Sequence, residues 1–133
     1  MHRLGAVLND ELRVVFAKAD LSDGDFDILA SLRRAGSPYS LSPGQLAETT
    51  MVSSGAITKR VDRLIERSLV ERSVNDRDAR GRRVALTKAG LGLVDDLVVV
   101  HLANEERLLA GFSRVEREQL TGLLRAWCER LDA

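Results

Sequence analysis

Residues 41–72 read LSPGQLAETTMVSSGAITKRVDRLIERSLVER and contain the patterns of two successive helices. The run Ser42-Pro43-Gly44-Gln45 has the pattern of a helix start, with serine as N-cap, proline in the first turn and a glutamine able to bond back to the cap. A short helix from Pro43 to about Thr49 is therefore expected. Met51-Val52 interrupts it.

A second helix is expected to begin at Ser53-Ser54-Gly55. Its apolar residues Ile57, Val61, Leu64 and Ile65 recur at helical spacing and predict one buried face. Two helices separated by three or four residues form a helix-turn-helix. The small residues at the start of the second helix suit entry into a DNA groove better than packing in a core.

The segment after the second helix has the pattern of a β-hairpin. Apolar residues at 69, 70 and 74 and again at 84–86 flank the polar stretch Asn75-Asp76-Arg77-Asp78-Ala79-Arg80-Gly81-Arg82. No core could absorb that stretch, so we interpret it as an arginine-rich hairpin tip.

Further helices are expected on both sides. Leu4, Val7, Leu8, Leu12, Val15 and Phe16 form one stripe of a helix over roughly residues 3–19. Ser22 and Asp25 have capping-box spacing before another helix that ends near residue 35. Thr87 precedes a long helix from Lys88 to about Leu109. A second capping box at Ser113 and Glu116 opens the last helix, whose apolar residues are Leu120, Leu123, Leu124, Trp127 and Leu131.

Composition limits the functional classes. The 133 residues carry 20 basic and 20 acidic side chains, and 44% are hydrophobic, which suits a single globular domain and excludes a histone-like basic protein. The charge is uneven, because residues 53–83 hold nine basic and five acidic side chains, a net +4. One cysteine and two separate histidines exclude an internal disulfide and argue against a metal site, so no cofactor is expected. The sequence has neither a membrane span nor a signal peptide, and a cytoplasmic location is expected.

Taken together, residues 41–72, the run Asp76-Arg77-Asp78-Ala79-Arg80-Gly81 and the run Leu86-Thr87-Lys88-Ala89-Gly90 resemble the MarR family of bacterial transcription regulators. The resemblance implies a mainly α fold with a small β-wing, formed by residues 1–133 as a single domain. Residues 21–87 would form the winged helix-turn-helix, and residues 1–20 and 88–133 would form dimerisation helices. Two positions depart from the family pattern. Ser68 occupies a place where many relatives have glycine, and Ala79 one where the wing often has a basic residue.

The candidate DNA-binding residues lie on the second helix of the motif and on the hairpin. They are Ser53, Ser54, Gly55, Thr58, Lys59, Arg60, Arg63, Arg77, Asp78, Arg80 and Arg82. Lysine and arginine neutralise phosphates, and serine and threonine approach the backbone or base edges. By analogy with the family, Arg80 would enter a minor groove while Asp78 braces the wing. The alternative is a solvated helix face and a charged loop.

The candidate dimerisation residues lie on the two terminal helices. They are Leu4, Leu8, Leu12, Val15, Leu120, Leu124, Trp127 and Leu131. These side chains could instead close a monomeric core, but two terminal helices with full apolar faces favour packing on a second copy. A dimer would present two recognition helices to half-sites about one turn of DNA apart, so the operator should be near-palindromic.

The resulting hypothesis is a homodimeric, sequence-specific repressor that binds double-stranded DNA and is released by a small-molecule effector, as the resemblance implies. The alternative is a winged-helix module that binds protein. An enzyme is not expected, because no nucleophile–base set, phosphate loop or metal constellation appears. Cys128 is interpreted as a small buried side chain rather than a redox sensor, and His101 as a surface or satisfied core residue rather than an effector contact.

Overall fold

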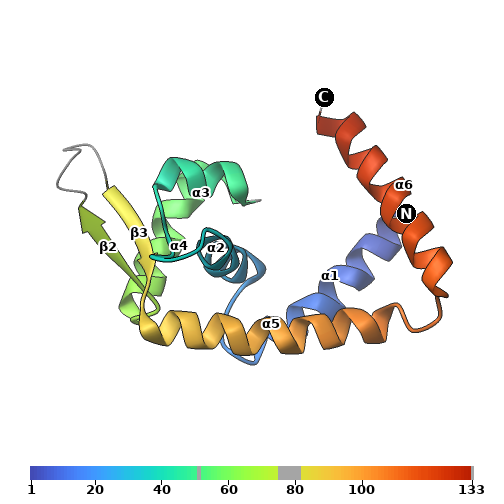
Figure 1. Ribbon diagram of the computed structural model, residues 1–133, viewed down its shortest axis with the longest axis horizontal. Coiled ribbons are helices and arrows are strands. Elements are labelled where there is room, and N and C mark those ends of the chain that lie inside the picture. Colours follow the sequence, from blue (N-terminus) through green and yellow to red (C-terminus); the bar gives the residue numbers. More distant parts are fainter. Residues whose placement is uncertain (51, 75–81, 133) are drawn as a thin grey trace. The chain divides into compact units, whose positions relative to one another are not determined.

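The computed structural model describes residues 1–50, 52–74 and 82–132 (Figure 1). The described elements are α1 (His2–Ala17), α2 (Asp23–Arg34), β1 (Ser40–Leu41), α3 (Pro43–Thr49), α4 (Ser54–Glu66), β2 (Val70–Val74), β3 (Arg82–Leu86), α5 (Lys88–Leu108) and α6 (Arg114–Asp132). They divide into two compact units, Met1–His101 and Leu102–Ala133. The expected fold class, mainly α with a small β-wing, is confirmed.

The three expected helix starts at Ser22, Ser42 and Ser113 are confirmed. In the first two, the serine hydroxyl accepts the backbone N–H three residues on, and that residue's side chain accepts the N–H of the serine. The same pair of bonds joins Ser113 and Glu116, at 3.2 and 2.8 Å. These bonds lower the pKa of the Glu116 carboxyl from its ordinary value. Each box satisfies two backbone donors that a helix start leaves unpaired.

The sheet has one strand more than the sequence analysis expected. Its order is β1-β3-β2, and both pairings are antiparallel. Ser40 of β1 pairs with Ala85, and the Arg83 guanidinium donates to both the hydroxyl and the carbonyl of Ser40 at 3.0 Å. A strand of two residues is too short to show the alternation of apolar and polar residues that predicts a strand. β1 is therefore recognised only by its hydrogen-bonded pairing with β3.

The core of the first unit is mainly aliphatic, with Phe16 as its buried aromatic residue. It is centred on α2 and the buried face of α4, and its fully buried members include Ile28, Leu29, Leu32, Leu46, Ile57, Val61, Leu64, Val84 and Val94. The expected buried face of α4 is thus confirmed for Ile57, Val61 and Leu64. The helix-turn-helix is held by the same core that covers the sheet.

Ser68, the residue that departs from the family pattern, has a left-handed backbone conformation with φ of 59°. It follows the C-cap of α4, where glycine adopts this conformation at little cost and other residues do not. We therefore expect Ser68→Gly to raise the free energy of unfolding by about 0.5–1 kcal/mol. Urea denaturation measures this, with Ser68→Ala as control. An equal gain in the alanine variant would contradict the explanation by backbone strain.

Candidate nucleic-acid interface

The turn between α3 and α4 sets where α4 begins. Helix α3 ends at its C-cap Thr50, whose hydroxyl donates to the carbonyl of Leu46 at 2.7 Å. Ser53 then caps α4 by accepting the N–H of Ala56 at 3.4 Å. The helix-turn-helix expected from the sequence therefore forms, with an N-capped second helix.

The amino-terminal part of α4 presents a small, polar surface. Ser53, Ser54, Gly55, Thr58 and Lys59 are all exposed. The helix has 13 residues and is about 20 Å long, and a DNA major groove admits an α-helix. Its N-terminus adds a partial positive charge that favours phosphate. The surface thus has the size, polarity and charge of a groove-binding face.

Two candidates on α4 are held by the protein itself. The Arg63 guanidinium donates to the Asp25 carboxylate at 2.8 Å, and Arg60 donates to the Ser22 hydroxyl at 2.6 Å. Arg60 also forms an ion pair with Asp25 at 3.5 Å. The sequence analysis placed Asp25 only as the acid of a capping box and did not connect it to α4. The spacing of 35 and 38 residues carries no local signal, so only the packing of α2 on α4 brings these groups together.

The wing is attached to the candidate interface through its strands. Arg72 of β2 donates to Asp62 of α4 at 2.8 Å, which ties the hairpin to the helix. Arg82 is exposed at the start of β3. The other wing candidates, Arg77, Asp78 and Arg80, lie outside the described residues.

The candidate dimerisation residues are mostly exposed in the single chain. Leu4, Leu124, Trp127 and Leu131 are 61%, 47%, 42% and 73% exposed, Leu8 is exposed, and Leu12 and Leu120 are half-buried. Among the described residues of α6, none is buried.

Two sequence-based interpretations need correction here. Val15 is buried in the chain's own core at 7% exposure, so it is not available to a partner, because its side chain packs inward beside Phe16. Cys128 is exposed, whereas we expected it to be buried.

A groove of about 840 Å³ lies in the first unit beside the start of α4. Phe16 of α1, Phe26 of α2, Arg60 of α4 and His101 of α5 are among its lining residues. The His101 ring lies 5.3 Å from the Phe16 ring and 5.5 Å from the Phe26 ring, centroid to centroid. His101 is thus half-buried among aromatic rings, and it contributes to a cavity as well as to packing.

Over residues 1–50, 52–74 and 82–132, no three histidine, cysteine, aspartate or glutamate side chains gather as a metal site would require. Over the same residues, no helix combines the length and apolar character needed to cross a bilayer.

Comparison with known proteins identifies relatives. A sequence model of the MarR family matches residues 19–81. The HTH-type transcriptional regulator PecS of Dickeya dadantii (strain 3937) is 36% identical over 124 residues, which cover 93% of this chain and 75% of PecS. The regulator MhqR of Bacillus subtilis (strain 168) is 28% identical over 119 residues, covering 89% of this chain and 79% of MhqR.

Solved structures agree with these relatives. A mutant of MarR from E. coli, complexed with operator DNA, superimposes with a TM-score of 0.82 at 27% identity, and the match covers 94% of this chain and 88% of that one. AbsC of Streptomyces coelicolor, a MarR family regulator, shares the fold with a TM-score of 0.87 at 23% identity, over 98% of this chain and 88% of AbsC. The chain belongs to the MarR family of transcription regulators.

Proposed function

We propose that this protein is a sequence-specific DNA-binding repressor that acts as a homodimer. The observation that carries the proposal is the exposed, N-capped start of α4 on an intact helix-turn-helix. Membership of a family of transcription regulators supports it, as does a relative of known structure that was solved with operator DNA. We also propose a cytoplasmic location, because a DNA-binding regulator acts where the chromosome lies.

The proposed contacts divide between the helix and the wing. Ser53, Ser54, Gly55, Thr58 and Lys59 would lie against the major groove, where small side chains allow close approach and Lys59 neutralises a phosphate. Arg77, Arg80 and Arg82 would supply the wing's positive charge, and Asp78 would brace it, as the resemblance to the family implies. Arg60 and Arg63 are omitted from this set, because α2 already holds their guanidinium groups.

Dimerisation is proposed from the apolar side chains of α1 and α6. Leu124 and Trp127 lie at helical spacing on α6, and Leu4 and Leu8 on α1, and all four are exposed in the single chain. Exposed apolar side chains at helical spacing favour an interaction site on each of these helices. A second copy would cover it and would also provide the second recognition helix.

Release by a small-molecule effector is proposed for the groove beside α4. It joins residues of α1, α2, α4 and α5, so a ligand there would contact both the terminal helix and the recognition helix. The Arg60 Nε atom is buried and has no hydrogen-bond acceptor among the described residues, which favours a ligand that carries one. A ligand that binds one orientation of α4 more tightly shifts the population toward it.

The proposal is tested by selecting duplexes from a random DNA pool with the purified protein and sequencing the bound fraction. We expect enrichment of a near-palindrome whose half-sites are about 10 base pairs apart, one turn of DNA. Recovery of unrelated sequences without a shared motif would contradict the proposal and favour a module that binds protein.

Lys59 should behave as a phosphate contact. We expect Lys59→Ala to weaken binding to selected and scrambled duplexes by a similar factor and to reduce the slope of log affinity against log salt by about one. Fluorescence anisotropy at several salt concentrations measures both quantities. Lys18→Ala, which removes the same charge from an exposed position at the end of α1, is the control and should leave the slope unchanged. Equal effects from both variants would refute the assignment.

A further inference from the structure

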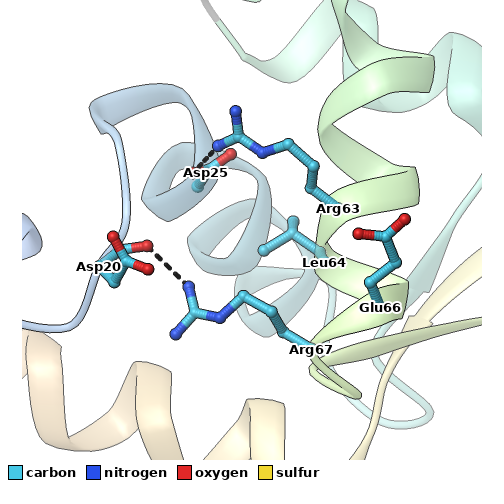
Figure 2. A pocket seen from close by; sticks show the side chains of 6 residues that line it. All are labelled: Asp20, Asp25, Arg63, Leu64, Glu66 and Arg67. Atoms are coloured by element: carbon cyan, nitrogen blue, oxygen red, sulfur yellow. Dashed lines mark hydrogen bonds and ion pairs between the residues drawn. The ribbon is translucent and has the colours of Figure 1, made fainter.

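Three arginines lie along one edge of α4 and its C-cap. Arg60, Arg63 and Arg67 are spaced three and four residues apart, which places them in a row on the helix surface. Figure 2 shows Arg63 and Arg67 extending from α4 toward Asp25 and Asp20, around a pocket of about 300 Å³. We call residues 18–25, which connect α1 to the first turn of α2, the α1–α2 junction. The arginine edge faces this junction.

Asp25 anchors the first contact. It is only 2% exposed, and its Oδ2 atom accepts both the Ser22 N–H at 2.9 Å and the Arg63 guanidinium at 2.8 Å. A buried carboxylate is stable only when it is paired and hydrogen-bonded. Arg63 therefore neutralises a buried carboxylate of the α1–α2 junction, although the Arg63 side chain is 61% exposed.

Arg67 makes the second contact. Its two terminal nitrogens donate to the carbonyls of Ala19 and Asp20 at 2.9 and 2.8 Å. These carbonyls follow the end of α1, and Asp20 has a φ of 57°, so the chain turns sharply there. The planar guanidinium fork holds two acceptors in a fixed geometry. Arg63 of α4 and Arg67 at its C-cap thus bond to the start of α2 and to the end of α1, respectively.

We propose that Arg63 and Arg67 are positioning residues for DNA recognition, which fix the orientation of α4 against the α1–α2 junction instead of neutralising phosphate. The inference rests on the proposed DNA-binding function. Base readout requires the start of α4 to enter the groove at a defined angle. If α4 is no longer held at that angle, its contacts to base edges weaken more than its contacts to phosphates. Non-specific binding depends on the number of charges near the phosphates, which these contacts do not set.

A double-mutant cycle on Asp25 and Arg63 tests the proposal. The probes are the duplex selected by the wild-type protein and a scrambled duplex of the same composition. Asp25→Asn and Arg63→Ala should each weaken binding to the selected duplex about tenfold or more, and the double variant should be no weaker than Asp25→Asn alone, because Arg63 acts through Asp25. Affinity for the scrambled duplex should change less than about twofold.

The opposite pattern would overturn the proposal. If Arg63 contacts phosphate, Asp25→Asn releases it and tightens binding to both duplexes, Arg63→Ala weakens both, and the effects add. A wild-type protein with no preferred duplex would instead contradict the proposed function and this inference with it, so the two failures are distinguishable.

Arg67→Ala repeats the test without altering the α2 cap. Asp25 is also the capping acid of α2, so Asp25→Asn puts the folding of that helix at risk. Circular dichroism and urea denaturation identify variants that are folded at the assay temperature. Folded Arg67→Ala should lose affinity for the selected duplex and keep its affinity for the scrambled one, whereas Lys59→Ala should lose both. An Arg67→Ala variant that still discriminates like the wild type would refute the positioning role.

Discussion

Gly90→Ala is expected to lower the free energy of unfolding by about 2–4 kcal/mol, because the added methyl group would clash with neighbouring backbone atoms. A Cβ atom at Gly90 would lie 1.9 Å from the carbonyl oxygen of Leu69 and 2.9 Å from its carbonyl carbon. Both are backbone atoms, so no side-chain rotation relieves the clash. The first turn of α5 would have to move away from the segment between α4 and β2.

Hydrogen bonds of Thr87 bring the first turn of α5 close to the backbone of Leu69. The Thr87 hydroxyl donates to the Ser68 carbonyl at 2.6 Å and accepts the Gly90 N–H at 3.0 Å, and the Thr87 N–H donates to Leu69 at 3.1 Å. The start of α5 is thus bonded directly to the backbone that follows α4.

Gly92→Ala is the matched control for Gly90. It lies one half-turn further along the same helix, and its Cβ would meet nothing within 4 Å. Alanine there should stabilise the protein by about 0.5–1 kcal/mol through helix propensity. Urea denaturation of both variants measures the difference. Similar changes in the two would show that helix propensity, and not the contact with Leu69, determines the effect at Gly90.

Leu124→Glu is expected to convert the proposed dimer into monomers and to weaken operator binding about a hundredfold or more, because the second half-site is no longer held by the same molecule. Leu124 is exposed in the single chain on a helix that has no buried side chain among its described residues. A carboxylate in the middle of an apolar interface has no partner and is costly to desolvate. Sedimentation velocity and anisotropy measure the two effects.

Arg125→Gln is the control for this substitution. It changes the net charge by the same single unit, and its position is about 100° around the helix from Leu124. We expect it to remain dimeric and to bind the operator like the wild type. If the Leu124→Glu protein still sedimented as a dimer, Leu124 would not lie in the dimer interface and the proposed interface would be wrong.

The helix-turn-helix was predictable because its signals are local. Ser42 with Gln45 and the apolar spacing of Ile57, Val61 and Leu64 each specify structure within one or two turns of helix. The resemblance to the family also marked position 68 as one where many relatives have glycine, and the positive φ of Ser68 supplies the physical reason.

Features that depend on distant parts of the chain were not predictable in the same way. The pairing of Ser40 with Ala85 needs the sheet to be assembled before the strand exists. Arg60 and Arg63 are indistinguishable in sequence from phosphate-binding arginines, and only the structure shows that both guanidinium groups contact buried Asp25. The apolar spacing of the first helix predicted both Val15 and Leu8 as dimer contacts, but only Leu8 is exposed. Such spacing identifies one face of a helix and does not indicate which end of that face packs on the chain's own core.

The most direct test of the central claim is the ratio of affinities of the wild-type protein for its selected duplex and for a scrambled one, measured by anisotropy between 50 and 200 mM salt. For a sequence-specific regulator we expect a ratio of about a thousand or more, with a dimer bound to each duplex. Both affinities should fall steeply with salt, by about a thousandfold for six phosphate contacts. Equal affinities that hardly respond to salt would contradict the account.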